Sequence, residues 1–132
     1  MQFSNFLRTV LKLDAASCLA MAAAVLPFAA ILEAPLGIEP AILNAAAAPL
    51  IPIGLFILWL GTRRSAPAAL VLLVIAGNVG WSVASIAAAS SLPQITRAGQ
   101  ILVIGQGLAV LMFAFLEWRG LRSAQLIQAS RP

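Results

Sequence analysis

Four apolar blocks of about twenty residues each, separated by short polar breaks, fill nearly the whole chain. An α-helix rises ~1.5 Å per residue, so about twenty residues cross a hydrocarbon core ~30 Å thick. The sequence therefore predicts an all-α membrane protein, a bundle of four transmembrane helices. The expected spans run at about 13–32, 41–60, 68–90 and 100–118.

The composition agrees with a bilayer rather than with water as the solvent. Of the 132 residues, 62% are hydrophobic and only 9% are charged, whereas soluble domains carry about 25% charged residues. A soluble domain of this length could not enclose four apolar helices. No polar stretch is long enough to hold a second core, so we expect one domain over residues 1–132.

The basic residues predict the orientation of the bundle. Seven of the eight fall on one side of the expected spans and only Arg97 falls on the other; the seven are Arg8, Lys12, Arg63, Arg64, Arg119, Arg122 and Arg131. By the positive-inside rule, both termini face the cytoplasm. The positive charges stand at helix ends and form no stripe or groove, so we expect the lipid bilayer and not nucleic acid as the partner.

The first segment is expected to stay in the protein as a span. Its apolar core runs to Leu32, beyond the 7–15 residues of a signal core. Apolar residues recur at three- and four-residue spacing between Phe3 and Leu13. That pattern fits either a short interfacial helix or an extension of the first span into the headgroups, and both remain open.

The chain is poor in residues that carry catalysis or bind metals. It has no histidine, and Cys18 is its single cysteine. An intrachain disulfide and a multi-cysteine metal site are therefore excluded, and the commonest general base and metal ligand is missing. Because neither paired carboxylates nor a nucleophile–base pair can be assembled from the sequence, we expect no enzyme, no metal and no cofactor.

Asn78 is the main polar exception inside the spans. Counted from Ala68, it lies ~15 Å deep, near the middle of the bilayer. Ser82 and Ser85 follow at four and seven residues and share its helix face, and Gln106 lies at the depth of Ser82 in the fourth span. These four residues form a candidate intramembrane polar site, either as structural hydrogen bonds between helices or as a substrate or ion site.

The partners of this group are expected on neighbouring helices. Pro49 and Pro52 each remove a helical hydrogen bond and free the carbonyls of Ala45 and Ala48 for Asn78 or Ser82. We also expect Ser82 to bond to Gln106 across the bundle.

A second candidate site is a charge cluster at the cytoplasmic end. Asp14 and Glu117 are placed in the end turns of their spans, and Asp14 is expected to pair with a basic residue of another segment. The alternative is that each acid simply caps a helix or is solvated. The expected members are Asp14, Glu117, Lys12, Arg63, Arg64 and Arg119.

Small residues predict where the helices approach closely. Gly77, Gly80 and Ala84 in the third span, and Gly105 and Ala109 in the fourth, are expected to lie at helix contacts. This favours a tightly packed bundle.

Four short motifs give the chain a resemblance to a group of proteins. They are LKLDAAS at 11–17, NVGW at 78–81, QGLAV at 106–110 and LEWRGLR at 116–122. On them the chain resembles small, uncharacterised four-helix integral membrane proteins of bacteria. The resemblance implies a four-span bundle in the bacterial cytoplasmic membrane and implies no activity.

Two functions fit these expectations. The first is a structural or accessory role, in which helix contacts join the chain to itself or to a larger membrane complex. The alternative is a small transporter or channel that uses the polar stripe of the third span.

Overall fold

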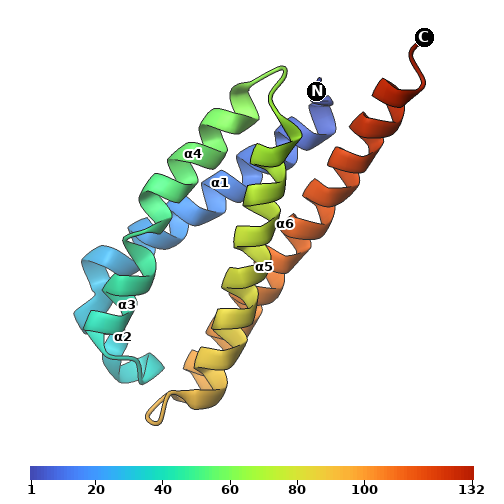
Figure 1. Cartoon of the computed structure of the whole chain (residues 1–132). Helices are drawn as coiled ribbons and strands as arrows, with labels where there is room; N and C mark the ends of the chain where they lie inside the picture. The colour runs from blue at the N-terminus through green and yellow to red at the C-terminus, as the bar shows by residue number, and fades with distance from the viewer.

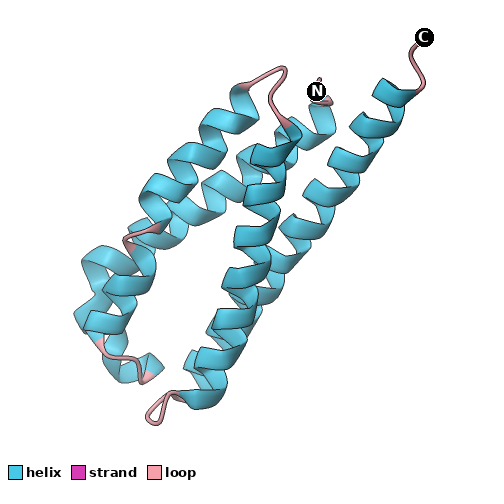
Figure 2. Cartoon of the chain, in the orientation of Figure 1, coloured by secondary structure: helices cyan, strands magenta, loops and turns pink.

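The computed structural model describes all 132 residues, and apart from short connections the chain is helical (Figures 1 and 2). The elements are α1 (Asn5–Val25), the 3-10 turn η1 (Leu26–Phe28), α2 (Ala29–Leu36), α3 (Pro40–Ala47), α4 (Leu50–Thr62), α5 (Ala68–Ser91) and α6 (Arg97–Ala129). They form four stretches long and apolar enough to cross a membrane. The predicted all-helical fold with four apolar helices is confirmed.

The helices extend further than the apolar blocks. α1 begins at Asn5, where the Ser4 hydroxyl accepts a hydrogen bond from the Leu7 amide at 3.1 Å. There is thus no separate interfacial helix, and the alternative of an extended first helix is correct. α6 likewise continues to Ala129, eleven residues beyond the expected end at Trp118. Hydropathy shows where apolar residues stop, whereas helical hydrogen bonds continue through polar turns.

Prolines break the first two spans into halves. The turn η1 contains Pro27, which lacks the N–H that would continue the ladder of α1. Between α3 and α4 the break falls at Ala48 and Pro49. The half-helices α2 and α3 turn away from the line of α1 and α4 and converge on the connection that follows α5 (Figure 1).

The bundle consists of two helix pairs. α1 packs along α4, and α5 packs along α6, while the pairs meet mainly through α1 and α6. α4 and α5 are consecutive in the chain but hardly touch, and they diverge in Figure 1. The hydrophobic core lies mostly within the first pair and at its contact with the second. Large apolar side chains elsewhere face outward, as expected for lipid-facing surfaces.

Glycines allow the closest helix contacts, but not the glycines expected from the sequence. Gly54 and Gly61 of α4 face α1, Gly107 faces Ser85, and Gly120 faces Leu7, each so closely that a Cβ atom would come within 3.1 Å of a neighbouring side chain. A Cβ at Gly77, Gly80 or Gly105 would instead meet nothing within 4 Å. The prediction that these three lie at contacts within the bundle is wrong.

Short segments join the two pairs at both ends. At the end that carries both termini (the terminal end), the Phe3 amide donates to the Arg64 carbonyl at 2.8 Å and the Ala66 amide to the Met1 carbonyl at 3.1 Å. At the opposite, far end, Thr96 bonds to the carbonyls of Pro35 and Leu36 at 2.7 and 3.0 Å. Hydrogen bonds therefore connect separate segments of the chain at both ends of the bundle.

Gly37 gives a prediction for the far end. It has φ 66°, and an added Cβ would collide with the backbone of Gln94. We expect Gly37→Ala to lower the free energy of unfolding by at least about 1 kcal/mol, because alanine is strained at this φ and the far end must shift. Thermal unfolding in mild detergent measures this. Gly105→Ala is the control and should be neutral or slightly stabilising; equal stability of both variants would contradict the packing described.

Candidate functional site

Two carboxyl groups and one amide meet inside the bundle. Nδ2 of Asn78 donates to Oδ2 of Asp14 at 2.8 Å and to Oε2 of Glu117 at 3.2 Å. The residues come from α5, α1 and α6, respectively. Asp14 and Glu117 are 0% exposed and Asn78 is 7% exposed. We call these three residues the acid–amide centre.

No basic side chain bonds to the acid–amide centre. The thiol of Cys18 lies 4.0 Å from the second oxygen of Asp14. Oε1 of Glu117 is buried and has no hydrogen-bond partner. Burial of an ionised carboxylate is costly unless it is paired and hydrogen-bonded, so two such groups without a cation are an energetic anomaly. Ionisable groups inside a membrane-spanning bundle are functional-site candidates by default.

The prediction that both acids belong to a cytoplasmic charge cluster is wrong. Asp14 and Glu117 bond to Asn78, near the middle of α5, and not to Lys12, Arg63, Arg64 or Arg119. Those four basic residues are exposed. The error follows from the helix ends: since α1 begins at Asn5 and α6 continues to Ala129, both acids lie well inside their helices. The sequence-based argument that no carboxylates can pair is overturned as well.

Arginines near the terminal end lie over tryptophans. The guanidinium of Arg63 is 4.5 Å from the ring centre of Trp59, and that of Arg122 is 5.2 Å from the ring centre of Trp118. Such cation–π contacts are favourable at exposed sites. They give these arginines partners that are independent of the buried acids.

The predicted polar stripe of α5 faces inward, but its partners differ from those expected. Asn78, Ser82 and Ser85 are all buried. The Ser82 hydroxyl lies 2.9 Å from the Asn78 carbonyl and 2.8 Å from that of Gly107. Gln106 does not bond to Ser82; its amide donates to the Ser85 hydroxyl at 2.7 Å.

The proposed use of the proline-freed carbonyls is also wrong. The Ala48 carbonyl accepts from the amide of Ile51 at 3.2 Å. Asn78 and Ser82 find their partners on α1 and α6, because α4 and α5 hardly touch.

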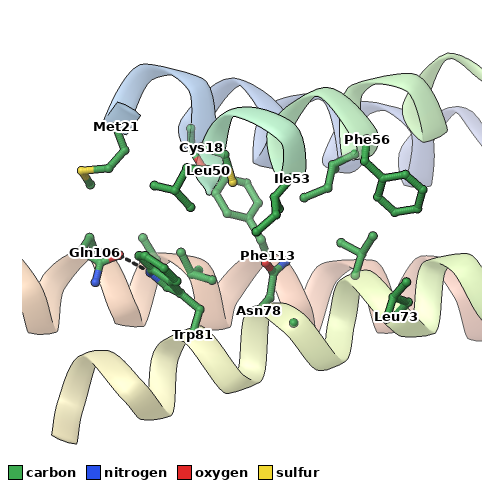
Figure 3. Close-up of a pocket in the computed structure, with 16 residues that line it drawn as sticks. Cys18, Met21, Leu50, Ile53, Phe56, Leu73, Asn78, Trp81, Gln106 and Phe113 are labelled. Atoms are coloured by element: carbon green, nitrogen blue, oxygen red, sulfur yellow. Dashed lines mark hydrogen bonds between the residues drawn. The ribbon is translucent and has the colours of Figure 1, made fainter. Parts of the chain in front are cut away.

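A cavity of about 460 Å³ lies next to the acid–amide centre, between the two helix pairs (Figure 3). All four spans line it, and twelve of its sixteen lining residues are hydrophobic. Asn78 and Trp81 extend from α5 into the space beneath α1 and α4 (Figure 3). Asn78 and Cys18 line the cavity and also contact Asp14, so they separate it from the carboxyl groups.

A second cavity, of about 270 Å³, continues toward the far end. The two cavities share four lining residues: Met21, Leu50, Trp81 and Gln106. The indole N–H of Trp81 donates to Oε1 of Gln106 at 2.8 Å across this shared wall. Trp81 is half-buried and lies between the two cavities.

Comparison of the chain with protein families, with curated proteins and with solved structures finds no match. The resemblance to small bacterial four-helix membrane proteins therefore stays a prediction from the sequence.

Asn78 gives a prediction for the energetics of the centre. We expect Asn78→Leu to cost about 2 kcal/mol or more in the free energy of unfolding, because it removes the only donor that both carboxyl groups share. The cost should shrink when Asp14→Leu and Glu117→Leu remove the acceptors. Denaturation in mixed detergent measures both. Asn44→Leu, at an exposed site on α3, is the control, and a cost no larger than its own would contradict the account.

Proposed function

We propose that the chain is a small membrane transporter whose substrate occupies the cavity beside the acid–amide centre. The observation that carries this proposal is the pair of buried carboxyl groups, unpaired with any base, directly behind a cavity lined by all four spans. Structural hydrogen bonds alone do not account for two acids at this position, because apolar residues would pack there at lower cost.

The cavity supports a substrate with an apolar body. Binding pockets of ~300–1,000 Å³ with mostly apolar walls and a few polar groups are typical of small-molecule sites. Here Asn78, Gln106 and Ser17 supply polar groups among hydrophobic neighbours. A site of this kind takes an amphipathic molecule and orients its polar end toward the acid–amide centre.

The arrangement of the helices supports alternating access. A transporter must open its site to one side of the membrane at a time, commonly by moving one helix group against another. In this chain the two helix pairs meet along α1 and α6, whereas α4 and α5 hardly touch, and the Trp81–Gln106 hydrogen bond lies between the two cavities. We infer that changes at these contacts open the cavities in turn.

We place the protein in the bacterial cytoplasmic membrane as a multi-pass protein with both termini inside. The seven-to-one distribution of basic residues supports the orientation. Both termini and the connection between α4 and α5 lie at the same end of the bundle (Figure 1), which agrees with four crossings.

A second candidate function is the structural or accessory role through helix contacts. It is favoured by a small-residue stripe on the exposed face of α5, spaced at four-residue intervals: Ala76, Gly80 and Ala84. A Cβ at Gly80 would meet nothing within 4 Å, so Gly80 leaves room for a second helix. Such stripes allow close approach of a second helix, either from another copy or from a larger complex.

A cavity-filling substitution tests the transport proposal. Gly77 lines the larger cavity, and a Cβ atom added there would meet no neighbour within 4 Å. We expect Gly77→Leu to reduce transport at least tenfold, because it occupies space that the substrate needs. The assay is release, from proteoliposomes, of dansyl derivatives that carry a quaternary ammonium, a carboxylate or no charge.

Gly105→Leu is the matched control, because Gly105 is equally free of neighbours and does not line the cavity. It should transport within about twofold of the unsubstituted protein. Absence of protein-dependent release for every derivative, or equal release by Gly77→Leu, would contradict the transport proposal.

The α5 stripe gives a test of the second candidate. If helix contacts join two copies, Gly80→Leu should shift the protein from dimer to monomer, because the leucine holds the helices apart. Photobleaching of single labelled particles in lipid nanodiscs counts the copies. A monomer before and after the substitution rules out self-association through this stripe.

A further inference from the structure

We propose that the acid–amide centre is a cation site, which takes an organic monocation in exchange for a proton. This inference rests on the proposed transport function and names its substrate class. It is carried by the geometry around Asp14 and Glu117.

The two acids of the centre have no cationic partner within the chain. Two acidic groups accept from one amide nitrogen, and no cationic group bonds to either. α5 carries no ionisable residue at all. The basic groups on the other packed helices are Arg8 and Lys12 on α1, Arg63 at the end of α4, and Arg97, Arg119 and Arg122 on α6; none of them donates a hydrogen bond to the centre. The other titratable group that faces the centre is the thiol of Cys18 on α1, 4.0 Å from Oδ1 of Asp14. The centre therefore needs a positive charge from outside the chain.

One oxygen of the centre has no partner. Oε1 of Glu117 is buried and accepts no hydrogen bond. Two carboxylates that share one buried site cannot both stay ionised at low cost. A proton on one of them removes a charge and supplies a donor for an oxygen that otherwise has none. In the empty state, a proton is thus the cation of the centre.

The cavity wall contains aromatic side chains. Trp81, Phe56 and Phe113 line the cavity in front of the centre (Figure 3). Aromatic faces attract cations, and the attraction is larger where water is excluded. An anion would be repelled by the negative charge that remains on the second acid, while a neutral molecule would gain nothing from that charge. The cavity and the centre together select a cation with an apolar body.

These features together lead to the exchange of a proton for an organic cation. When the organic cation enters, its charge replaces that of the proton. The carboxyl O–H bond then breaks, its electron pair stays on the carboxylate oxygen, and the proton passes to water. When the cation leaves, a proton returns to the carboxylate. One proton is released for each cation bound.

Equilibrium binding to the unsubstituted protein in mild detergent tests the exchange. Tetraphenylphosphonium is the probe, and tetraphenylborate, an anion of similar size and shape, is the control. We expect the cation to bind at least tenfold more tightly than the anion. At acidic pH its Kd should rise about tenfold for each unit of pH lost, as one-for-one competition with a proton requires. In weakly buffered solution, about one proton should appear per cation bound.

Variants at the acids locate the site. Asp14→Asn or Glu117→Gln should weaken tetraphenylphosphonium binding at least tenfold and flatten its pH dependence. Glu33→Gln and Glu39→Gln remove the other two acids of the chain, both exposed, and should change neither. Thermal unfolding verifies that each variant is folded, and the proton count on the unsubstituted protein needs no variant.

Three outcomes overturn the inference: equal binding of the cation and the anion, binding without proton release, or unchanged pH dependence in both acid variants. Failure of the cation inference can be distinguished from failure of the transport proposal. If only the carboxylate or the neutral dansyl derivative is released from proteoliposomes and the release depends on the cavity, the chain is a transporter but its substrate is not a cation.

Discussion

One amide nitrogen holds two acidic side chains in the interior of the bundle, and no basic group compensates them. Asn78 thereby ties α5 to α1 and to α6 at a single point. Buried acids without a base are costly. The size of this cost depends on whether a proton or another cation neutralises them. In the function we propose, such a cation enters the cavity in front of Asn78 and Cys18, whose mostly hydrophobic walls suit an apolar body.

The packing of the helices leaves room for this site. Close glycine contacts hold α4 against α1 at Gly54 and Gly61, and α6 against α5 at Gly107. Gly120 brings α6 against Leu7 of α1. No comparable contact draws α4 toward α5, so the two cavities lie between the pairs. The close contacts and the open interior thus arise from where glycines face a neighbour and where they do not.

The sequence predicted the four apolar helices and the inward-facing stripe of α5, because hydropathy and spacing report directly on which segments are apolar and on which face a residue lies. The sequence-based prediction put Asp14 and Glu117 at the helix ends. It did so because the helices continue through polar turns, and hydropathy does not show where a helix ends. The hydrogen-bond partners of Asn78 could not be predicted from hydropathy either, because they depend on which helices pack together. One signal was present: the chain has just four acids, and two of them, Asp14 and Glu117, fall inside the expected spans at 13–32 and 100–118.

Infrared spectroscopy of the protein in lipid detects whether a buried acid carries a proton, because the C=O stretching band of a carboxylic acid separates from the bands of carboxylates. We expect a carboxylic acid band at neutral pH that disappears in the Asp14→Asn, Glu117→Gln double variant and persists in the Glu33→Gln, Glu39→Gln double variant. We also expect tetraphenylphosphonium to reduce this band. A spectrum without the band, or a band that survives the loss of both buried acids, would contradict the account.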